Sequence, residues 1–400
     1  MSKIDKMIAE LCPDGVDFMP LEQVLDYEQP SKYIVESTKY DDSYKMPVLT
    51  AGQTFILGYT NETTGIYKAT KESPVIIFDD FTTSFHWVDF NFKIKSSAMK
   101  LLTPKNTKLA LFKYLLYAMK CIQYEPAGHE RQWISKYSQI RVPIPPLPVQ
   151  QEIVRILDKF TELTAELTAE LTARKIQYEF YRNSLLNFDK RTDVRGGGYR
   201  QQVIWTKLSE VCNIRSGGTP SKIYSEYWTN GSIKWLGSSV CKNQKTVSEI
   251  TNYITEQGLK NSSAKMIREN STLIALVGAT IGKVAFLPFE ATINQNIAAL
   301  YPLDTNVLDP SYLYYVCTTL YEKFIGLTSE KFGMASLSFV KGLTIPLPSL
   351  AEQKRIAALL NKFEIMTTDL TTGLPAEIAA RKKQYEYYRN KLLTFKELAA

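Results

Sequence analysis

The chain has 400 residues, 44% of them hydrophobic and 22% charged, which is typical of a globular chain of two to three domains. Its 48 Lys and Arg against 41 Asp and Glu give a net charge of +7, compatible with nucleic-acid binding but not with indiscriminate polybasic binding. Five cysteines without a CxxC pair indicate reduced thiols and a cytoplasmic protein. No apolar signal region opens the sequence, and no apolar run is long enough for a transmembrane helix.

Residues 1–145 are predicted to form a first domain of mixed helices and strands. A short helix is expected before the turn at residues 13–15, which contain Pro, Asp and Gly. Residues 75–78 and 87–92 are predicted strands, the second because apolar and polar residues alternate. Residues 109–121 have the apolar spacing of an amphipathic helix.

Residues 146–188 are predicted to form one long helix. A proline-rich entry at 143–147 holds the preceding chain extended, and apolar residues then recur at steps of three and four from Ile153 to Leu171. This stretch contains the tetrapeptide Thr-Ala-Glu-Leu twice in succession. Residues 189–200 are charged and contain three consecutive glycines, which indicates a flexible linker.

Residues 201–345 are predicted to form a second domain, and residues 346–400 a second long helix. Strands are expected at 271–276 and 283–287, on either side of a glycine turn, and a helix at 309–324. The closing helix contains a Gly-Leu-Pro sequence at 373–375, which predicts a kink or a break into two segments.

The two halves are related by an internal duplication. Residues 174–186 recur with few changes at 381–393, and the proline-rich entries at 143–147 and 346–350 also correspond. Between these landmarks the second copy is four residues longer, the length of one tetrapeptide. We therefore expect the two long helices to pack on each other as a spacer between the domains. The alternative is that each is an ordinary core helix of its own domain.

No catalytic constellation is visible in the sequence. Residues 278–283 resemble a phosphate-binding loop, but the spacing is one residue short and Val284 replaces the required Ser or Thr. Residues 309–312 lack the second proline of the Asp-Pro-Pro-Tyr element of amino-methyltransferases, and Glu352 to Lys354 has no acidic metal partner. Two histidines are too few for a histidine-based metal site. We expect no catalytic residue, no metal and no bound cofactor.

Several loops instead carry residue types suited to DNA. The small, basic loop from Ser216 to Lys222 offers amides, hydroxyls and a lysine to phosphate oxygens, and the amides at 294–296 can pair with adenine. Ordinary solvated turns are the alternative for each loop. The candidate DNA contacts are Tyr59, Thr60, Asn61, Thr82, Thr83, Ser84, Lys95, Ser97, Arg131, Ser216, Gly217, Gly218, Thr219, Ser221, Lys222, Thr280, Lys283, Asn294, Gln295 and Asn296.

Together these features resemble the specificity subunit of type I restriction–modification systems, most closely the type IC group. The resemblance spans nearly the whole chain and is carried by the 217–222 loop, residues 278–283, the amides at 294–296, the proline-rich entries and the two repeated stretches. It implies an α+β protein in which two mixed α/β target-recognition domains are separated by two long antiparallel helices, with an internal pseudo-two-fold repeat. The first domain departs from the pattern, because it lacks the Gly-Gly-Thr-Pro-Ser and Asn-Gln-Asn elements.

The same resemblance implies the partners. These are double-stranded DNA, of which each domain reads one half of a split site, two modification subunits that bind S-adenosylmethionine, and motor–nuclease subunits that use ATP and Mg²⁺. A single-chain DNA methyltransferase and a coiled-coil assembly protein are the competing functions. Aromatic and arginine side chains dominate many protein interfaces, and the two repeated stretches contain several of both. A structural role between the two helices is the equal alternative for them. The candidate partner contacts are Tyr178, Tyr181, Arg182, Tyr385, Tyr388 and Arg389.

Overall fold

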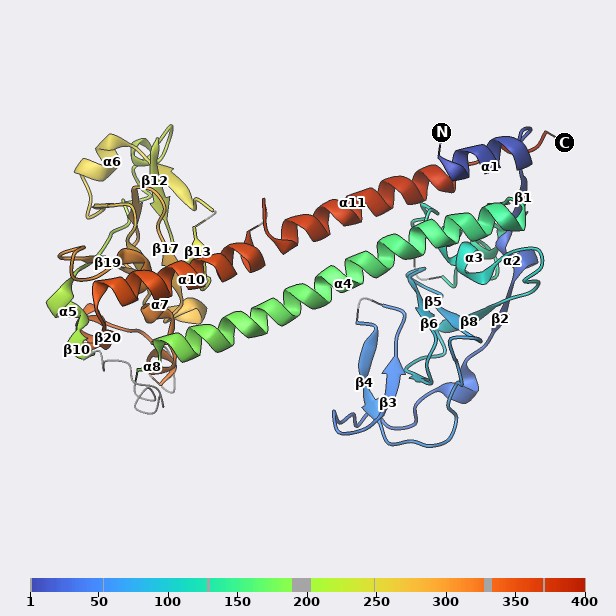
Figure 1. Ribbon diagram of the computed structural model, residues 1–400, viewed down its shortest axis with the longest axis horizontal. Coiled ribbons are helices and arrows are strands. Elements are labelled where there is room, and N and C mark those ends of the chain that lie inside the picture. Colours follow the sequence, from blue (N-terminus) through green and yellow to red (C-terminus); the bar gives the residue numbers. More distant parts are fainter. Residues whose placement is uncertain are drawn as a thin grey trace. The chain divides into compact units, whose positions relative to one another are not determined.

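The computed structural model describes residues 2–52, 54–126, 128, 130–188, 203–247, 249–326, 333–369 and 371–399. The predicted linker at 189–200 and His129 lie outside these residues. The chain divides into two units, one made of Met1–Glu166 and Ala379–Ala400 and the other of Leu167–Ile378. Both units draw on the long helices, because the division falls inside α4 (Leu147–Leu186) and α11 (Leu374–Leu392) (Figure 1).

The first unit contains a four-stranded sheet of order β2-β8-β5-β6, a three-stranded sheet of order β4-β3-β7 and the pair β1-β9. Its strands are β1 (Asp17–Pro20), β2 (Leu25–Glu28), β3 (Met46–Leu49), β4 (Ile56–Thr60), β5 (Val75–Asp79), β6 (Phe85–Val88), β7 (Lys93–Ile94), β8 (Met99–Pro104) and β9 (Arg141–Ile144). Its short helices are α1 (Lys3–Leu11), α2 (Leu21–Val24) and α3 (Phe112–Met119). The prediction of a mixed domain is confirmed for this unit.

Strand β5 is the centre of the first unit. Its four apolar residues from Val75 to Phe78 are fully buried, because Ile76 and Phe78 face the core with α3 while Val75 and Ile77 face a second core. Such a continuous apolar run is typical of a strand that is covered on both faces. The expected strand at 87–92 is wrong in its bounds: β6 ends at Val88, and Phe92 pairs with Tyr67 outside the sheet.

Helix α3 is more deeply buried than an amphipathic helix would be. Every residue of it except Lys113 is buried, and the Tyr114 hydroxyl donates a hydrogen bond to the carbonyl of Pro143 (2.9 Å). Helix α1 begins with a capping box in which Ser2 and Asp5 each accept from the other's backbone N–H. It is followed by the predicted turn, where Gly15 has φ +119° and a Cβ atom would meet the carbonyl of Lys396.

The second unit repeats this plan with more strands. Its sheets have the orders β11-β19-β16-β17-β13, β14-β12-β18-β15 and β10-β20. Its strands are β10 (Ile204–Lys207), β11 (Cys212–Ser216), β12 (Ile233–Leu236), β13 (Gln244–Thr246), β14 (Asn252–Ile254), β15 (Met266–Ile267), β16 (Thr272–Ala275), β17 (Val284–Phe286), β18 (Ala291–Ile293), β19 (Ile297–Pro302) and β20 (Thr344–Leu347). Its other helices are α5 (Leu208–Val211), α6 (Glu256–Lys260), α7 (Pro310–Thr318), α8 (Tyr321–Ile325), α9 (Leu337–Gly342) and α10 (Leu350–Thr368).

The predicted strands at 271–276 and 283–287 are confirmed as β16 and β17, which pair antiparallel. The predicted helix at 309–324 is divided into α7 and α8. Asp309 caps α7 by accepting from the backbone N–H of Tyr312 (2.8 Å), with Pro310 at the first helical position. The Tyr312 hydroxyl then donates to the carbonyl of Pro346 (2.8 Å), as Tyr114 does to Pro143 in the first unit.

The first long helix is continuous, but the second is not. Helix α4 runs unbroken for 40 residues, whereas α10 ends at Thr368 and α11 begins at Leu374. The Asp369 carboxylate accepts from the backbone N–H of Thr371 (2.7 Å), and a Cβ atom at Gly373 would lie 2.5 Å from the carbonyl of Ile365. The predicted break is therefore confirmed, and the second helix is not one long helix. Within the described residues, no helix is both long and apolar enough to cross a membrane.

Candidate nucleic-acid interface

Two of the predicted loops of the second unit meet at the carboxyl end of β18. The backbone N–H of Gly218 donates to the carbonyl of Ile293 (2.9 Å), and a Cβ atom at Gly217 would overlap that same carbonyl. Glycine is therefore required for the 216–222 loop to approach β18 so closely. The Thr219 hydroxyl reaches the next loop and donates to the side-chain oxygen of Gln295 (2.7 Å).

The three amides at 294–296 have different roles. Asn294 uses its side-chain oxygen to accept from the backbone N–H of Asn296 (3.0 Å), and its own N–H donates to the carbonyl of Leu236 (2.9 Å). Asn294 therefore shapes the turn. Gln295 is exposed at the tip of the turn, where its side-chain oxygen accepts from Thr219 and its NH₂ group adds two hydrogen-bond donors.

The loop that carries Thr280 and Lys283 lies beside these amides. The backbone N–H of Leu276 donates to the carbonyl of Asn296 (2.9 Å), so the turn that follows β16 starts next to the 294–296 turn. Gly278 and Gly282 have φ of +67° and +73°, conformations that other residues rarely adopt. The 216–222, 276–283 and 294–296 loops thus form one cluster, which we call the second loop cluster.

The first unit contains an equivalent first loop cluster, built from residues 79–84 and 95–98. The N–H of Lys95 donates to the carbonyl of Leu49 (3.1 Å), and the N–H of Ala98 donates to the hydroxyl of Ser96 (3.1 Å). The N–H of Asp80 donates to the carbonyl of Ala98 (2.8 Å). The first and third of these bonds correspond to those made by Asn294 and Leu276, although the 95–98 turn is one residue longer than the 294–296 turn. Counted back from Ala98 and Asn296, Ser97 lies where Gln295 lies.

The predicted contacts Thr82, Thr83 and Ser84 lie in this first cluster. Asp79 accepts from the backbone N–H of Thr82 (2.8 Å), and the Thr82 hydroxyl donates to that of Ser84 (3.1 Å). Thr83 has φ +57°, a conformation that a β-branched residue rarely adopts. This strained, polar turn presents hydroxyl groups next to Ser97.

A buried ion pair, which the sequence did not reveal, attaches Arg131 to the same cluster. Lys100 lies 3.0 Å from Asp80, and both side chains are fully buried. Asp80 also accepts from the backbone N–H groups of Gln132 (3.1 Å) and Trp133 (2.8 Å). The exposed Arg131 guanidinium is held 3.9 Å from the same carboxylate. Asp80 therefore connects the 79–84 turn to Arg131.

The structure does not bring Tyr59, Thr60 and Asn61 to the first loop cluster. Thr60 pairs with Met46 at the start of β3, whereas the first cluster lies beyond Leu49 at the other end of that strand. Thr60 is also buried, and its hydroxyl accepts from the backbone N–H of Glu62 (3.3 Å). Its side chain is used within the fold rather than exposed to a ligand.

The candidate partner contacts lie on the repeated stretches, where the aromatic rings pack inside their own units. Tyr181 stacks on Phe363 with ring centroids 5.3 Å apart, and Tyr388 stacks on Phe160 at the same distance. Arg182 and Arg389 lie 5.9 and 5.8 Å from the rings of Tyr178 and Tyr385 and donate to neighbouring asparagines. These contacts give the six residues a structural role.

Two aromatic residues that the sequence reasoning missed are far more exposed. Phe180 and Tyr387 occupy the same place in the two copies of the repeat and are 68% and 61% exposed. Helical periodicity could have predicted their exposure, since each directly precedes a packed tyrosine and neighbouring residues of a helix point in different directions. In the part of the chain that is described, no group of three metal-ligating side chains occurs.

A family model and the similar proteins of known sequence all point to the same family. The family model described as "Type I restriction modification DNA specificity domain" matches residues 13–174 and 203–380. The type I restriction enzyme EcoR124I/EcoR124II specificity subunit of Escherichia coli is 44% identical over 99% of this chain and 97% of its own length. A putative type I restriction enzyme specificity subunit of Haemophilus influenzae is 29% identical over 95% and 96% of the two chains.

A solved structure has the same fold. The S subunit of a type I restriction–modification system from M. genitalium superposes with a TM-score of 0.62 at 14% identity, covering 95% of this chain and 96% of that one. The match of the family model to both halves and the full-length identity to a curated relative decide the assignment. The chain belongs to the DNA specificity subunits of type I restriction–modification systems.

Proposed function

We propose that each domain reads one half of a split DNA site through its loop cluster, and that the chain itself performs no catalysis. Methyl transfer and cleavage belong to modification subunits and motor–nuclease subunits that assemble on it in the cytoplasm. The observation that carries this proposal is the shared frame of the two clusters. The backbone hydrogen bonds that begin and end the turn are the same in both clusters, while the first turn is one residue longer and the exposed side chains differ. Two loop clusters with similar backbone hydrogen bonds but different exposed side chains can recognise two different half-site sequences.

The helices complete this proposal. We assign residues 1–145 and 201–345 to the two readers and residues 146–188 and 346–400 to an antiparallel spacer with pseudo-two-fold symmetry. The spacer fixes the distance between half-sites and docks the modification subunits. The exposed, equivalent positions of Phe180 and Tyr387 support a docking role, because two copies of one partner would require the same surface twice.

The decisive experiment compares the purified chain with the chain plus modification subunits. The chain alone is expected to transfer no methyl group and to bind no S-adenosylmethionine, whereas the complex methylates a bipartite site. Methyl transfer by the chain alone would establish the single-chain methyltransferase instead. A complex that binds all duplexes equally would favour the assembly protein.

A matched pair of variants tests the reading loops. Gln295→Ala is expected to change which second half-site is methylated, since the exposed amide at the tip of the turn is lost. Gln257→Ala, at an exposed position of α6 outside the loop cluster, is the control and is expected to leave both half-sites unchanged. Genome-wide mapping of methylated adenines in the presence of the modification subunits measures both.

A further inference from the structure

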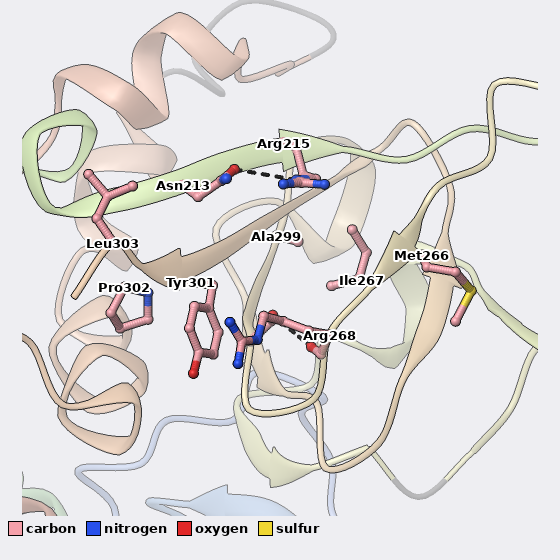
Figure 2. A pocket seen from close by; sticks show the side chains of 10 residues that line it. Asn213, Arg215, Met266, Ile267, Arg268, Ala299, Tyr301, Pro302 and Leu303 are labelled. Carbon is pink, nitrogen blue, oxygen red and sulfur yellow. Dashed lines mark hydrogen bonds between the residues drawn. The ribbon is translucent and has the colours of Figure 1, made fainter. Parts of the chain in front are cut away.

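A pocket of about 280 Å³ opens in the second unit beside the edge strand β11, outside the second loop cluster. Its wall includes Asn213 and Arg215 of β11, Tyr301 of β19, and Arg268, which follows β15 (Figure 2). Asn213 and Arg215 are two residues apart and therefore face the same side of the sheet. Among the residues that the structure describes, none that lines the pocket is acidic.

Both guanidinium groups are held in place by neighbours that leave their charge uncompensated. Arg215 donates from Nε to the side-chain oxygen of Asn213 (3.3 Å), which leaves its terminal NH₂ groups available. Arg268 lies 3.8 Å from the centre of the Tyr301 ring. Among the described residues, neither arginine is in an ion pair with a carboxylate. Two fixed, unpaired guanidinium groups match the several oxygens of a phosphate group.

The first unit shows that the fold does not need these arginines. Strands β2 and β11 pair in the same register with β8 and β19, since Leu25 lies opposite Pro104 and Cys212 opposite Pro302. Counting from these pairs, Asp26 and Glu28 stand where Asn213 and Arg215 stand, and each forms an ion pair with a lysine of its own unit. This place thus has two carboxylates paired with lysines in the first unit, but Asn213 and the unpaired Arg215 in the second, so the first unit does not repeat the basic pocket.

We propose that this pocket binds a backbone phosphate of the DNA flanking the second half-site. The proposal rests on the proposed function and deepens it. Arg215 directly precedes the 216–222 loop, and β19 follows the 294–296 turn, so the pocket adjoins the second loop cluster. A phosphate held there would fix the position of the duplex without reading its sequence. The first unit, with Asp26 and Glu28 at this place, makes no equivalent contact.

The test uses the chain assembled with its modification subunits and a duplex that carries the methylated site. Arg215→Gln, Arg268→Gln and the double variant are compared with Lys260→Gln, which removes a charge from exposed α6. Loss of one phosphate contact should lower the slope of log K against log salt by about 0.9. Because both arginines serve one phosphate, we expect the double variant to lose about the same slope as either single variant. Methylation mapping should show both half-sites unchanged.

Neutral methylphosphonates placed one at a time along the duplex identify the phosphate. One position flanking the second half-site should weaken binding by the wild-type complex, and the same substitution should have no further effect on the double variant. If every position affects the double variant as it affects the wild type, the pocket does not contact DNA. A wild-type complex without sequence-selective binding would instead refute the proposed function itself.

A free anion is the competing occupant. Inorganic phosphate is titrated against the chain and against the double variant by calorimetry. Saturable binding that only the wild-type chain shows, together with DNA binding by the variants equal to that of Lys260→Gln, would assign the pocket to a small phosphate ligand and overturn the DNA contact. Melting temperatures within the range of the Lys260→Gln control confirm that the variants fold.

Discussion

The side-chain amides of Gln150 and Gln353 make the same three hydrogen bonds in the two units. Gln150 accepts from the backbone N–H of Leu111 (2.8 Å) and donates to the carbonyls of Leu109 (3.0 Å) and Pro145 (2.7 Å). Gln353 accepts from Asp309 (2.9 Å) and donates to Val307 and Pro348 (both 2.9 Å). Both are fully buried, so each amide joins the start of a long helix to the chain that precedes α3 or α7.

Gln353→Leu should therefore destabilise the second unit strongly. It keeps the approximate size of the side chain but removes the partner of three backbone groups, of which the Pro348 carbonyl is bonded in a buried site and the other two in part-buried sites. An unsatisfied buried group costs about 1–3 kcal/mol. We expect a loss of about 1–3 kcal/mol, measured by hydrogen exchange of α7 and α10, which reports on this unit alone. Lys354→Leu, at the neighbouring exposed position, is the control. An equal effect of the two variants would show that the amide bonds do not matter.

The lysines of the second loop cluster should contribute to affinity but not to sequence choice. Lys222 is exposed next to Ser221, and Lys283 is half-buried beside the turn that contains Thr280. Lys222→Ala or Lys283→Ala is expected to weaken binding to all duplexes and to reduce its salt dependence, as the loss of a phosphate contact does. Binding isotherms at several salt concentrations measure this. A change confined to one half-site sequence would instead identify the lysine as a base contact.

Partner docking should depend on Phe180 and Tyr387 more than on the tyrosines beside them. Tyr181 and Tyr388 stack on Phe363 and Phe160, so their replacement by Ala should lower stability by about 1–3 kcal/mol. Phe180→Ala and Tyr387→Ala remove rings that are mostly exposed and should leave stability nearly unchanged while weakening assembly with the modification subunits.

Sedimentation of the complex and thermal melting of the chain separate the two effects. Normal assembly of the Phe180→Ala, Tyr387→Ala double variant would exclude this surface from docking. Normal stability of Tyr181→Ala would in turn show that its stacking on Phe363 contributes little to the fold.

One carboxylate should make stability depend on acid pH. Hydrogen bonds from Arg155 (both 2.8 Å), with the Lys3 ammonium, lower the pKa of Glu152 from 4.5 to about 2. A lowered pKa means that this stabilisation is present above pH 4.5 and is lost as the pH falls toward about 2. Glu152→Gln should therefore be less stable than the wild type at pH 7, with a difference that shrinks below pH 4.5.

Urea unfolding between pH 3 and 7, at intervals of about one unit, measures this difference. Glu162→Gln, at an exposed position of the same helix, is the control for the change from Glu to Gln. A constant difference between Glu152→Gln and the wild type across this range would mean that the ion pairs of Glu152 contribute nothing.

Helix α4 should act as a ruler for the spacer between half-sites. The two Thr-Ala-Glu-Leu units at 164–171 lie inside its unbroken 40 residues. A third unit after Leu171 would add about 6 Å of rise and a net rotation of about 40°. One DNA base pair adds about 3.4 Å and, at about 10 base pairs per turn, about 36°. The added rotation, rather than the added rise, is expected to set the new spacer length, because a domain that faces the wrong side of the groove cannot bind.

The expected result is therefore a spacer longer by one base pair with both half-sites unchanged, measured by methylation mapping. Thr164→Ala with Thr168→Ala changes the same units without adding length and should leave the spacer as it was. An unchanged spacer in the insertion variant, or an altered half-site, would refute the ruler.

The amino-acid sequence by itself determined the features that depend on local pattern. The duplication, the continuous apolar periodicity of α4 and the break at Gly373 could all be predicted, because helix formation depends on residues three and four apart and on glycine and proline. The loops at 216–222 and 294–296 could also be singled out, since their residue types suit DNA. That Thr219 and Gln295 touch could not be predicted, because 75 residues separate them in the chain.

Tertiary structure alone decided which distant residues meet. The parallel pairs β3–β7 and β12–β18 bring loops together that no local periodicity connects, and they reveal the 95–98 and 294–296 turns as equivalents. The Asp80–Lys100 ion pair and the pocket of Arg215 and Arg268 depend on the same long-range pairing. Strand order in a sheet is set by the burial of both faces across the whole domain, so a strand's own residues specify that it is a strand but not which neighbours it will have.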